Sequence, residues 1–304
     1  MQQGFTWRVA VFIAPALLVY GLFSAWPLLD TLRLGLYAAD ESGQRSFSAL
    51  ANYRTILSDP QWSGAFWNAM RNNLTFFVIH MLVQNPMGLL LAALLSLKDV
   101  RFAAAYRTVF FLPTLLSVVI VGFVWQLILS PLWGVSERLL SAVGLGDWFA
   151  PWLGLEPTAL VTLSLMSVWQ FVGVPMMLIY AALIAIPEDI IEAALVEGAS
   201  SWRIFWQIRL PLILPTLGLV TILTFVANFN AFDLVYTVKG ANAGPNYSTD
   251  ILGTLFYRTF FGYQSQVASP TMGAAVATLM FLVILVGVAV YLLLVQRRLQ
   301  RFAF

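Results

Sequence analysis

Six long apolar runs constrain this chain more than any other feature of its sequence. They occupy residues 9–29, 74–96, 108–130, 159–186, 210–236 and 271–295. A transmembrane α-helix needs about 20 predominantly apolar residues, so each run is long enough to cross a bilayer. Only 10% of the residues are charged, whereas ordinary soluble domains carry about 25%. The sequence therefore predicts an all-α membrane protein with six transmembrane helices.

The lysines and arginines between these runs predict an orientation. One side of the membrane would hold nine of them in four short segments: Arg8, Lys98, Arg101, Arg107, Arg203, Arg209, Arg297, Arg298 and Arg301. The other side would hold seven, spread over three longer loops: Arg33, Arg45, Arg54, Arg71, Arg138, Lys239 and Arg258. Positive charge is enriched in cytoplasmic loops. Both termini are therefore expected in the cytoplasm.

The whole chain, residues 1–304, is expected to form a single transmembrane domain. The first apolar run is longer than the core of a signal peptide, which has about 7–15 residues, so it is interpreted as an uncleaved span. None of the three external loops has the character of a separate folded domain.

Residues 187–215 join the fourth and fifth predicted spans on the cytoplasmic side. Pro187 suits a helix start, where its missing N–H is not needed. The acidic residues that follow it suit the positive end of the helix dipole. We expect a helix over 190–196, a break at Gly198 and a second short helix over 200–208.

These two helices could lie on the lipid surface or dock on a protein. A lipid-facing role is possible for short amphipathic helices. However, the first helix carries acidic side chains that anionic cytoplasmic lipids would repel. These are Glu188, Asp189, Glu192 and Glu197. A groove on a soluble partner is therefore the favoured contact, and the lipid surface remains the alternative.

The same segment resembles the EAA loop of binding-protein-dependent ABC-importer permeases. The pattern is carried by Glu192, Ala193, Ala194, Glu197, Gly198, Ala199, Phe205, Ile208, Leu210, Pro211 and Pro215. The usual aspartate before the glycine is glutamate here. In that family the loop docks in a cleft of the ATPase subunit and transmits its closure. The resemblance thus implies an ATPase-coupling role for Glu192, Ala193, Ala194, Glu197, Gly198, Ala199, Phe205 and Pro211.

Other segments are similar to carbohydrate-uptake permeases of this family, such as the larger maltose permease subunit and the glycerol-phosphate permease subunit. They include Asn52-Tyr53, Asn73 to Phe76, Phe111 to Pro113, Phe232-Asp233 and Tyr236-Thr237. The resemblance implies a heterodimer with a second permease, two ATPase subunits and an extracytoplasmic solute-binding protein. It also implies the inner membrane of a bacterial or archaeal cell.

A sugar path needs hydrogen-bonding groups and flat aromatic faces, with few fixed charges. The fifth run supplies Thr224, Asn228 and Asn230 between phenylalanines, and polar residues in spans usually face the bundle interior. Asn228 also aligns with a sugar-contacting asparagine of the maltose subunit. Trp169 and Gln170 in the fourth run are further candidates. Contact between neighbouring helices remains the alternative role for each of them.

Several kinds of chemistry are not expected. The chain has no cysteine and a single histidine, His80, so neither a metal site nor a Ser/His/Asp set is predicted, and His80 is interpreted as a packed polar residue. No Gly-rich loop with Lys and Ser/Thr is present for binding ATP. We therefore expect no catalytic residues, no cofactor and no nucleic-acid partner, with ATP hydrolysis on a separate subunit.

The predicted function is import of a sugar or polyol by alternating access. One alternative is the same kind of importer carrying a glycerol phosphoester or another small polar metabolite. A second alternative is an ion-coupled carrier, for which Asp233 would be an intramembrane relay. The favoured interpretation of Asp233 is that it reaches water or caps the following loop.

Overall fold

The computed structural model describes residues 7–40, 43–97, 100–264 and 266–297. The chain divides into two compact units. One comprises residues 1–66 and 255–281, and the other comprises residues 67–254 and 282–304.

The first unit begins with an apolar helical stretch that continues into a small hairpin. Its elements before the boundary are α1 (Trp7–Tyr20), the π-helical turn η1 (Gly21–Ala25), α2 (Trp26–Leu34), β1 (Tyr37–Ala39), β2 (Arg45–Phe47) and α3 (Ala51–Ser58). The strands are antiparallel, with Tyr37 opposite Phe47. Phe12 and Phe23 in the helical stretch are 86% and 77% exposed. Water would disfavour such a surface, which suits lipid or another apolar partner.

The second predicted span belongs to a much longer helix than the apolar run indicated. It consists of α4 (Pro60–Ile79), the π-helical turn η2 (His80–Gln84) and α5 (Asn85–Leu95). The π-helical turn has a local cause, because Pro86 has no N–H and its ring crowds the carbonyl one turn earlier. The Asn85 N–H instead donates to the oxygen of His80, five residues back.

The third and fourth predicted spans are bent. Helix α6 (Ala103–Phe111) with the 3₁₀ turn η3 (Leu112–Leu115) meets α7 (Val118–Leu129) at 96°. The run 108–130 is therefore not one straight helix, since Leu116 and Ser117 are extended. Helix α9 (Glu156–Phe171) meets α10 (Gly173–Ile184) at 43°.

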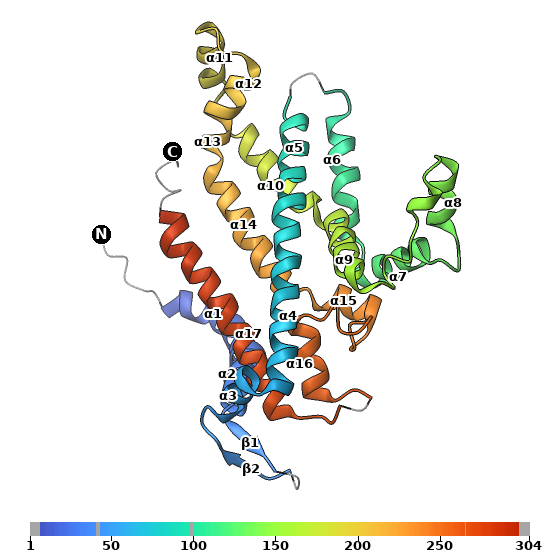
Figure 1. Ribbon diagram of the computed structural model, residues 1–304. Coiled ribbons are helices and arrows are strands. Elements are labelled where there is room, and N and C mark those ends of the chain that lie inside the picture. The colour runs from blue at the N-terminus through green and yellow to red at the C-terminus, as the bar shows by residue number, and fades with distance from the viewer. Residues whose placement is uncertain (1–6, 41–42, 98–99, 265, 298–304) are drawn as a thin grey trace. The chain divides into compact units, whose positions relative to one another are not determined.

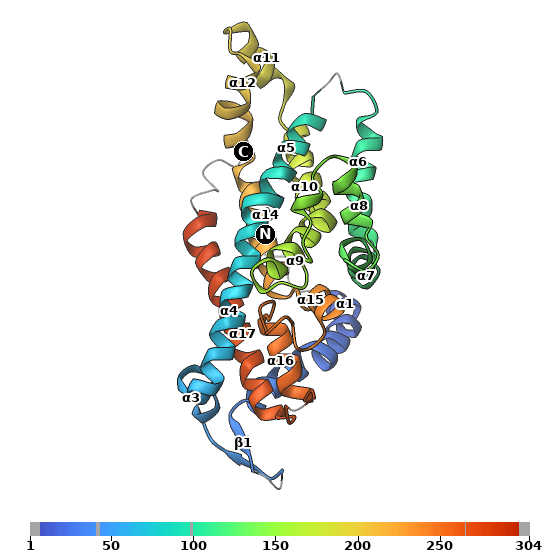
Figure 2. The same cartoon turned by 45° about the vertical axis from the view of Figure 1, so that its right-hand side comes forward.

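The remaining elements complete the membrane helices and the loops between them. They are α8 (Val135–Ala142), η4 (Gly146–Trp148), α11 (Glu188–Val196), α12 (Ser201–Ile204), η5 (Phe205–Arg209), α13 (Leu210–Leu212), α14 (Leu214–Phe229), α15 (Phe232–Lys239), α16 (Leu252–Phe261), α17 (Pro270–Val290) and η6 (Tyr291–Gln296). Within the second unit, α11 and α12 extend past the ends of α5 and α14 (Figures 1 and 2).

The described residues contain four continuous helical stretches that are long and apolar enough to cross a membrane. These are Val11–Leu34, Pro60–Leu95, Leu214–Lys239 and Pro270–Gln296. The two bent pairs raise the number to six if each pair crosses as one span. The prediction of a helical membrane protein with several spans is thus confirmed, and the count of six stays a prediction.

The charges that predict the orientation are only partly described. Lys98, Arg298 and Arg301 lie outside the described residues, and so does the side chain of Arg8. The cytoplasmic location of both termini therefore also remains a prediction.

Close backbone contacts hold the inner helices of the second unit together. Helix α5 packs on α10, which also contacts α6 and α14 (Figure 1). Met176 and Ile179 of α10 are fully buried in the apolar cluster at this contact. Gly173 permits the approach of α6, because an added Cβ would lie 2.7 Å from the Phe110 oxygen.

Asparagines on α4 fasten the segment between α15 and α16. Asn68 Nδ2 donates to Tyr247 O at 2.9 Å, and Asn72 Nδ2 donates to Asp250 O at 2.8 Å. Asn73 is fully buried. Its Nδ2 donates to Asn228 O at 3.0 Å, and its Oδ1 accepts from Leu252 N at 2.8 Å. One side chain thus links α4, the end of α14 and the start of α16.

Replacing Asn73 by leucine is expected to destabilise the protein, because it leaves the buried Leu252 N–H without its acceptor. The cost is about 1–3 kcal/mol for each buried group left unpaired. Asn68→Leu is the matched control on the same helix, since its hydrogen bond is exposed. Thermal unfolding in detergent, monitored by tryptophan fluorescence, should show a clearly larger decrease in unfolding temperature for Asn73→Leu than for Asn68→Leu. Equal losses would contradict this account.

Gly173→Ala is expected to lower stability by about 1–3 kcal/mol through overpacking. The new methyl group would meet backbone atoms of α6 that no rotamer change can move. Gly64 in α4 has nothing within 4 Å of an added Cβ, so Gly64→Ala should be neutral or stabilising by up to about 1 kcal/mol. The same unfolding measurement compares the two variants, and an unaffected Gly173→Ala protein would show that the contact is not tight.

Candidate functional site

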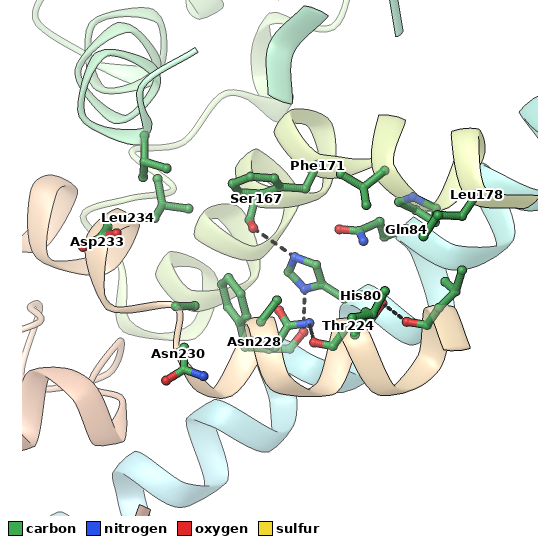
Figure 3. A pocket seen from close by; sticks show the side chains of 18 residues that line it. His80, Gln84, Ser167, Phe171, Leu178, Thr224, Asn228, Asn230, Asp233 and Leu234 are labelled. Carbon is green, nitrogen blue, oxygen red and sulfur yellow. Dashed lines mark hydrogen bonds between the residues drawn. The ribbon is translucent and has the colours of Figure 1, made fainter. Parts of the chain in front are cut away.

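A cavity of about 380 Å³ lies within the second unit, bordered by η2, α9, α10, α14 and the start of α15 (Figure 3). Its polar lining residues are His80, Gln84, Ser167, Thr224, Asn228, Asn230 and Asp233. Phe76 and Phe171 add aromatic surface. None of the described residues that line it is a lysine or arginine. The cavity therefore combines neutral hydrogen-bonding groups with aromatic faces.

His80 has both ring nitrogens paired inside the protein. Its Nδ1 lies 2.8 Å from Phe76 O, and its Nε2 lies 3.0 Å from Ser167 Oγ (Figure 3). Because a carbonyl oxygen can only accept, Nδ1 carries the proton and donates. In the neutral ring, Nε2 then accepts from the Ser167 hydroxyl. This agrees with the interpretation of His80 as a packed polar residue, although its ring also lines the cavity.

Gln84 lies one turn beyond His80 and is 5% exposed. Its Oε1 is buried and has no hydrogen-bond partner within the described chain. Figure 3 shows the Gln84 amide pointing into the cavity. Buried polar groups are nearly always paired, so this amide is exceptional among the lining residues.

Two residues predicted for a substrate path, Thr224 and Asn228, lie on the cavity wall. Both are buried. The Thr224 hydroxyl lies 2.8 Å from Val220 O and 3.2 Å from Asn85 Oδ1. Asn228 Nδ2 donates to Thr224 O at 2.7 Å. These bonds fix both side chains on one face of α14, where the cavity lies.

The other predicted path residues are placed differently. Asn230 lines the cavity at the end of α14, where its Nδ2 donates to Val226 O at 2.9 Å. Trp169 and Gln170 are not among the lining residues. The Trp169 ring packs edge-on against Trp125 at 5.6 Å between centroids. Gln170 is fully buried, and its Nε2 donates to Leu116 O at 3.0 Å. The structure therefore places these two in helix packing.

Asp233 lines the cavity from the first turn of α15 and is exposed. A carboxylate at that position interacts favourably with the positive end of a helix dipole. This location agrees with the interpretation that Asp233 reaches water.

Sequence reasoning did not single out Gln84 or Ser167 as site residues. A signal for Gln84 was present, since Phe76, His80 and Gln84 are spaced four apart within an apolar run. Residues at this spacing share one helix face, as Thr224 and Asn228 do. Ser167 carried no comparable signal, because a single serine in a span often bonds its own backbone.

The loop predicted to couple to an ATPase has a sharply defined turn. Helix α11 ends at Val196, and Gly198, two residues later, has a φ of +78°. The Ala199 N–H donates to Ala194 O and the Gly198 N–H to Leu195 O, each at 3.0 Å. This is a Schellman motif, which requires a left-handed residue after the helix. Ser200 Oγ then accepts from Arg203 N at the start of α12. The two predicted helices and the break between them are thus present.

The coupling residues named from the sequence lie on and after this turn. Glu192, Ala193, Glu197 and Gly198 are exposed, whereas Ala194, Ala199, Phe205 and Pro211 are half-buried. Large apolar side chains stand beside them, with Val196 88% and Trp202 73% exposed.

Comparison with known proteins places this architecture in a family. Residues 60–300 match the model of the binding-protein-dependent transport system inner membrane component. The probable starch degradation products transport system permease protein AmyD of Thermoanaerobacterium thermosulfurigenes is 31% identical over 293 residues, covering 95% of this chain and 94% of that protein. The lactose transport system permease protein LacF of Rhizobium radiobacter is 30% identical over 282 residues, covering 93% and 91%.

A solved structure has the same fold. It is that of a bacterial ABC transporter involved in the import of the acidic polysaccharide alginate, with a TM-score of 0.80, 23% identity and 96% coverage of both chains. The family match covers most of the chain and confirms the resemblance seen in the sequence. The protein therefore belongs to the inner-membrane permeases of binding-protein-dependent ABC transport systems.

Proposed function

We propose that this chain is the permease subunit of an ATP-driven importer for a sugar or polyol, working by alternating access. Two of its relatives are named for lactose and for starch degradation products. The cavity supports the same class of solute, because it offers amides, hydroxyls and the phenyl rings of Phe76 and Phe171. Sugars need both kinds of surface, since their hydroxyls hydrogen-bond and their C–H faces stack on aromatic rings.

The observation that carries the proposal is the connection between the loop and the cavity. The chain runs from α11 through the Gly198 turn, α12 and α13 directly into α14. Thr224, on the cavity wall, is ten residues after Leu214 at the start of α14. At a rise of 1.5 Å per residue, that separation is about 15 Å. A displacement of the loop would therefore move α14, and with it one wall of the cavity.

The loop, residues 187–215, would dock on an ATPase subunit. Its acidic side chains and the exposed Val196 and Trp202 call for a protein groove that covers apolar surface and pairs negative charge. Glu192, Ala193, Ala194, Glu197, Gly198, Ala199, Phe205 and Pro211 would transmit ATP-driven closure to α14. ATP hydrolysis would take place on that partner.

The proposed topology has six spans in a single transmembrane domain, residues 1–304, with both termini in the cytoplasm. Each bent helix pair then crosses the membrane once. A second permease would complete the translocation path as a heterodimer, with two ATPase subunits and an extracytoplasmic solute-binding protein. The exposed apolar helix faces support contact with lipid and with the second permease.

The two alternatives receive less support. A glycerol phosphoester would favour a basic group for its phosphate, and the described lining contains no lysine or arginine. An ion-coupled carrier would favour buried, paired charges. Asp233 is the only carboxylate among the described lining residues, and it is exposed.

Reconstitution in proteoliposomes tests the proposed function. The chain with its second permease, both ATPase subunits and the binding protein should accumulate a labelled neutral sugar from a panel that includes lactose and maltotriose, and only with ATP. The purified chain alone should not do so on a proton or sodium gradient. Uptake by the chain alone, or uptake of glycerophosphocholine in place of every sugar, would contradict the proposal.

Gly198→Val tests the coupling role. A β-branched residue at this φ strains the turn by about 1–2 kcal/mol, so the variant should still insert and assemble but lose most of its coupling between ATP hydrolysis and uptake. Gly144 is a matched control, because it has φ +76°, open space around its Cα and the same pattern of capping bonds after α8. Gly144→Val should retain coupling. Normal uptake per ATP in Gly198→Val would count against the docking role.

A further inference from the structure

The polar groups that line the cavity differ in how far the protein itself satisfies them. His80 and Ser167 bond each other, Thr224 bonds a carbonyl, and the Asn228 amide N–H bonds within α14. Among the buried lining residues, Gln84 is the exception. It makes no side-chain hydrogen bond within the described chain, and its Oε1 is fully enclosed. The paired groups are held in place as part of the cavity wall, whereas the Gln84 amide can still form hydrogen bonds with a molecule in the cavity.

This conclusion does not depend on which end of the amide is oxygen. The two ends of a glutamine side chain are assigned from their hydrogen bonds, and here neither end has a partner in the described chain. A buried amide without partners is unfavourable. Its position is therefore explained if something that enters the cavity supplies the missing bonds.

The local backbone supports a specific role for this position. Gln84 is the last residue of the π-helical turn η2, and such turns inside helices frequently occur at functional sites. Pro86, two residues later, fixes where the turn falls. Phe171 and Leu178 also line the cavity, so apolar side chains contribute to the surroundings of the amide. A hydrogen bond made there is shielded from bulk water and is strengthened by its surroundings.

We propose that Gln84 is a solute-binding residue, and that its amide hydrogen-bonds an oxygen of a polyhydroxylated, uncharged solute. The inference rests on the proposed function and adds a recognition group to it. A primary amide can donate or accept, and a sugar hydroxyl offers both an acceptor and a donor. In the proposed orientation, Gln84 lies about 16 Å from the inner end of its helix at Leu95. It would hold the solute at the inner part of the cavity, away from Asn230 and Asp233.

Uptake by the assembled transporter gives the first test. Gln84→Met keeps the length of the side chain but removes both hydrogen-bonding groups, and should lower sugar uptake about threefold to tenfold. Gln84→Glu keeps an acceptor oxygen and should retain more uptake than Gln84→Met. Gln126 lies outside the cavity, where its Nε2 donates to Val238 O, so Gln126→Met controls for loss of a glutamine from a span. Unchanged uptake in Gln84→Met would mean that water alone pairs the amide, and would overturn the proposal.

Thiol labelling gives a second test that does not depend on the cargo. The chain contains no cysteine, so a single Gln84→Cys residue can be followed without background from this subunit. A small hydrophilic methanethiosulfonate reagent should modify Gln84→Cys in the assembled transporter. It should not modify Ser164→Cys, because Ser164 is fully buried on α9 and bonds Leu160 O. An unreactive Gln84→Cys would show that no solute reaches this position.

The two tests separate failure of this inference from failure of the proposed function. If the wild-type transporter imports no sugar but Gln84→Cys reacts and Gln84→Met lowers uptake of glycerophosphocholine, the assignment of uncharged sugars is wrong, and only the role of Gln84 as a solute-binding residue stands. If sugar is imported normally by Gln84→Met, the proposed function stands and the role of Gln84 is wrong.

Discussion

Every backbone N–H and C=O group of a membrane-spanning segment must find a partner inside the protein, because lipid offers none. This constraint explains why the apolar runs are helical, and it also shows where departures from a regular helix are tolerated. The π-helical turn η2, the extended residues Leu116 and Ser117, and the break at Asn230 all lie in the second unit. Near two of these departures a neighbouring helix pairs a backbone carbonyl, since Gln170 Nε2 donates to Leu116 O and Asn73 Nδ2 donates to Asn228 O. Two of these departures border the cavity. The irregular backbone and the polar cavity therefore have a common basis.

The same requirement sorts the polar side chains by role. Asn73 and Gln170 are fully buried and bond backbone groups of other segments, so they hold the helices together. Thr224 and Asn228 bond within α14 and present their remaining surface to the cavity. The Gln84 side chain makes no hydrogen bond in the described chain. Some buried polar side chains thus connect helices, and others keep donors or acceptors that no protein group uses. A group that recognises a solute is expected to be of the second kind.

The loop and the cavity belong to one continuous piece of chain. The Schellman motif at Gly198 fixes the direction in which α12 leaves α11, and the chain then enters α14. A rigid helix transmits a displacement from one end to the other. In the proposed mechanism, ATP-driven movement of the loop therefore acts on Thr224 and Asn228 through the chain segment η5, α13 and α14.

The sequence by itself determined the helical membrane architecture, the break at Gly198 and the permease family, and the family match confirms the last of these. Hydropathy and turn chemistry are local, so they can be read from neighbouring residues. Only the tertiary structure showed three other features: the bend between η3 and α7, the early start of α4 at Pro60, and the packing of Trp169 and Gln170. It also decided that Gln84 faces a cavity while Gln170 does not. Both are glutamines in apolar runs, and in each the side-chain Oε1 is buried without a partner. Only contacts between residues far apart in the chain distinguish them, because Gln170 Nε2 bonds Leu116 O in the core, whereas the Gln84 side chain lines the cavity.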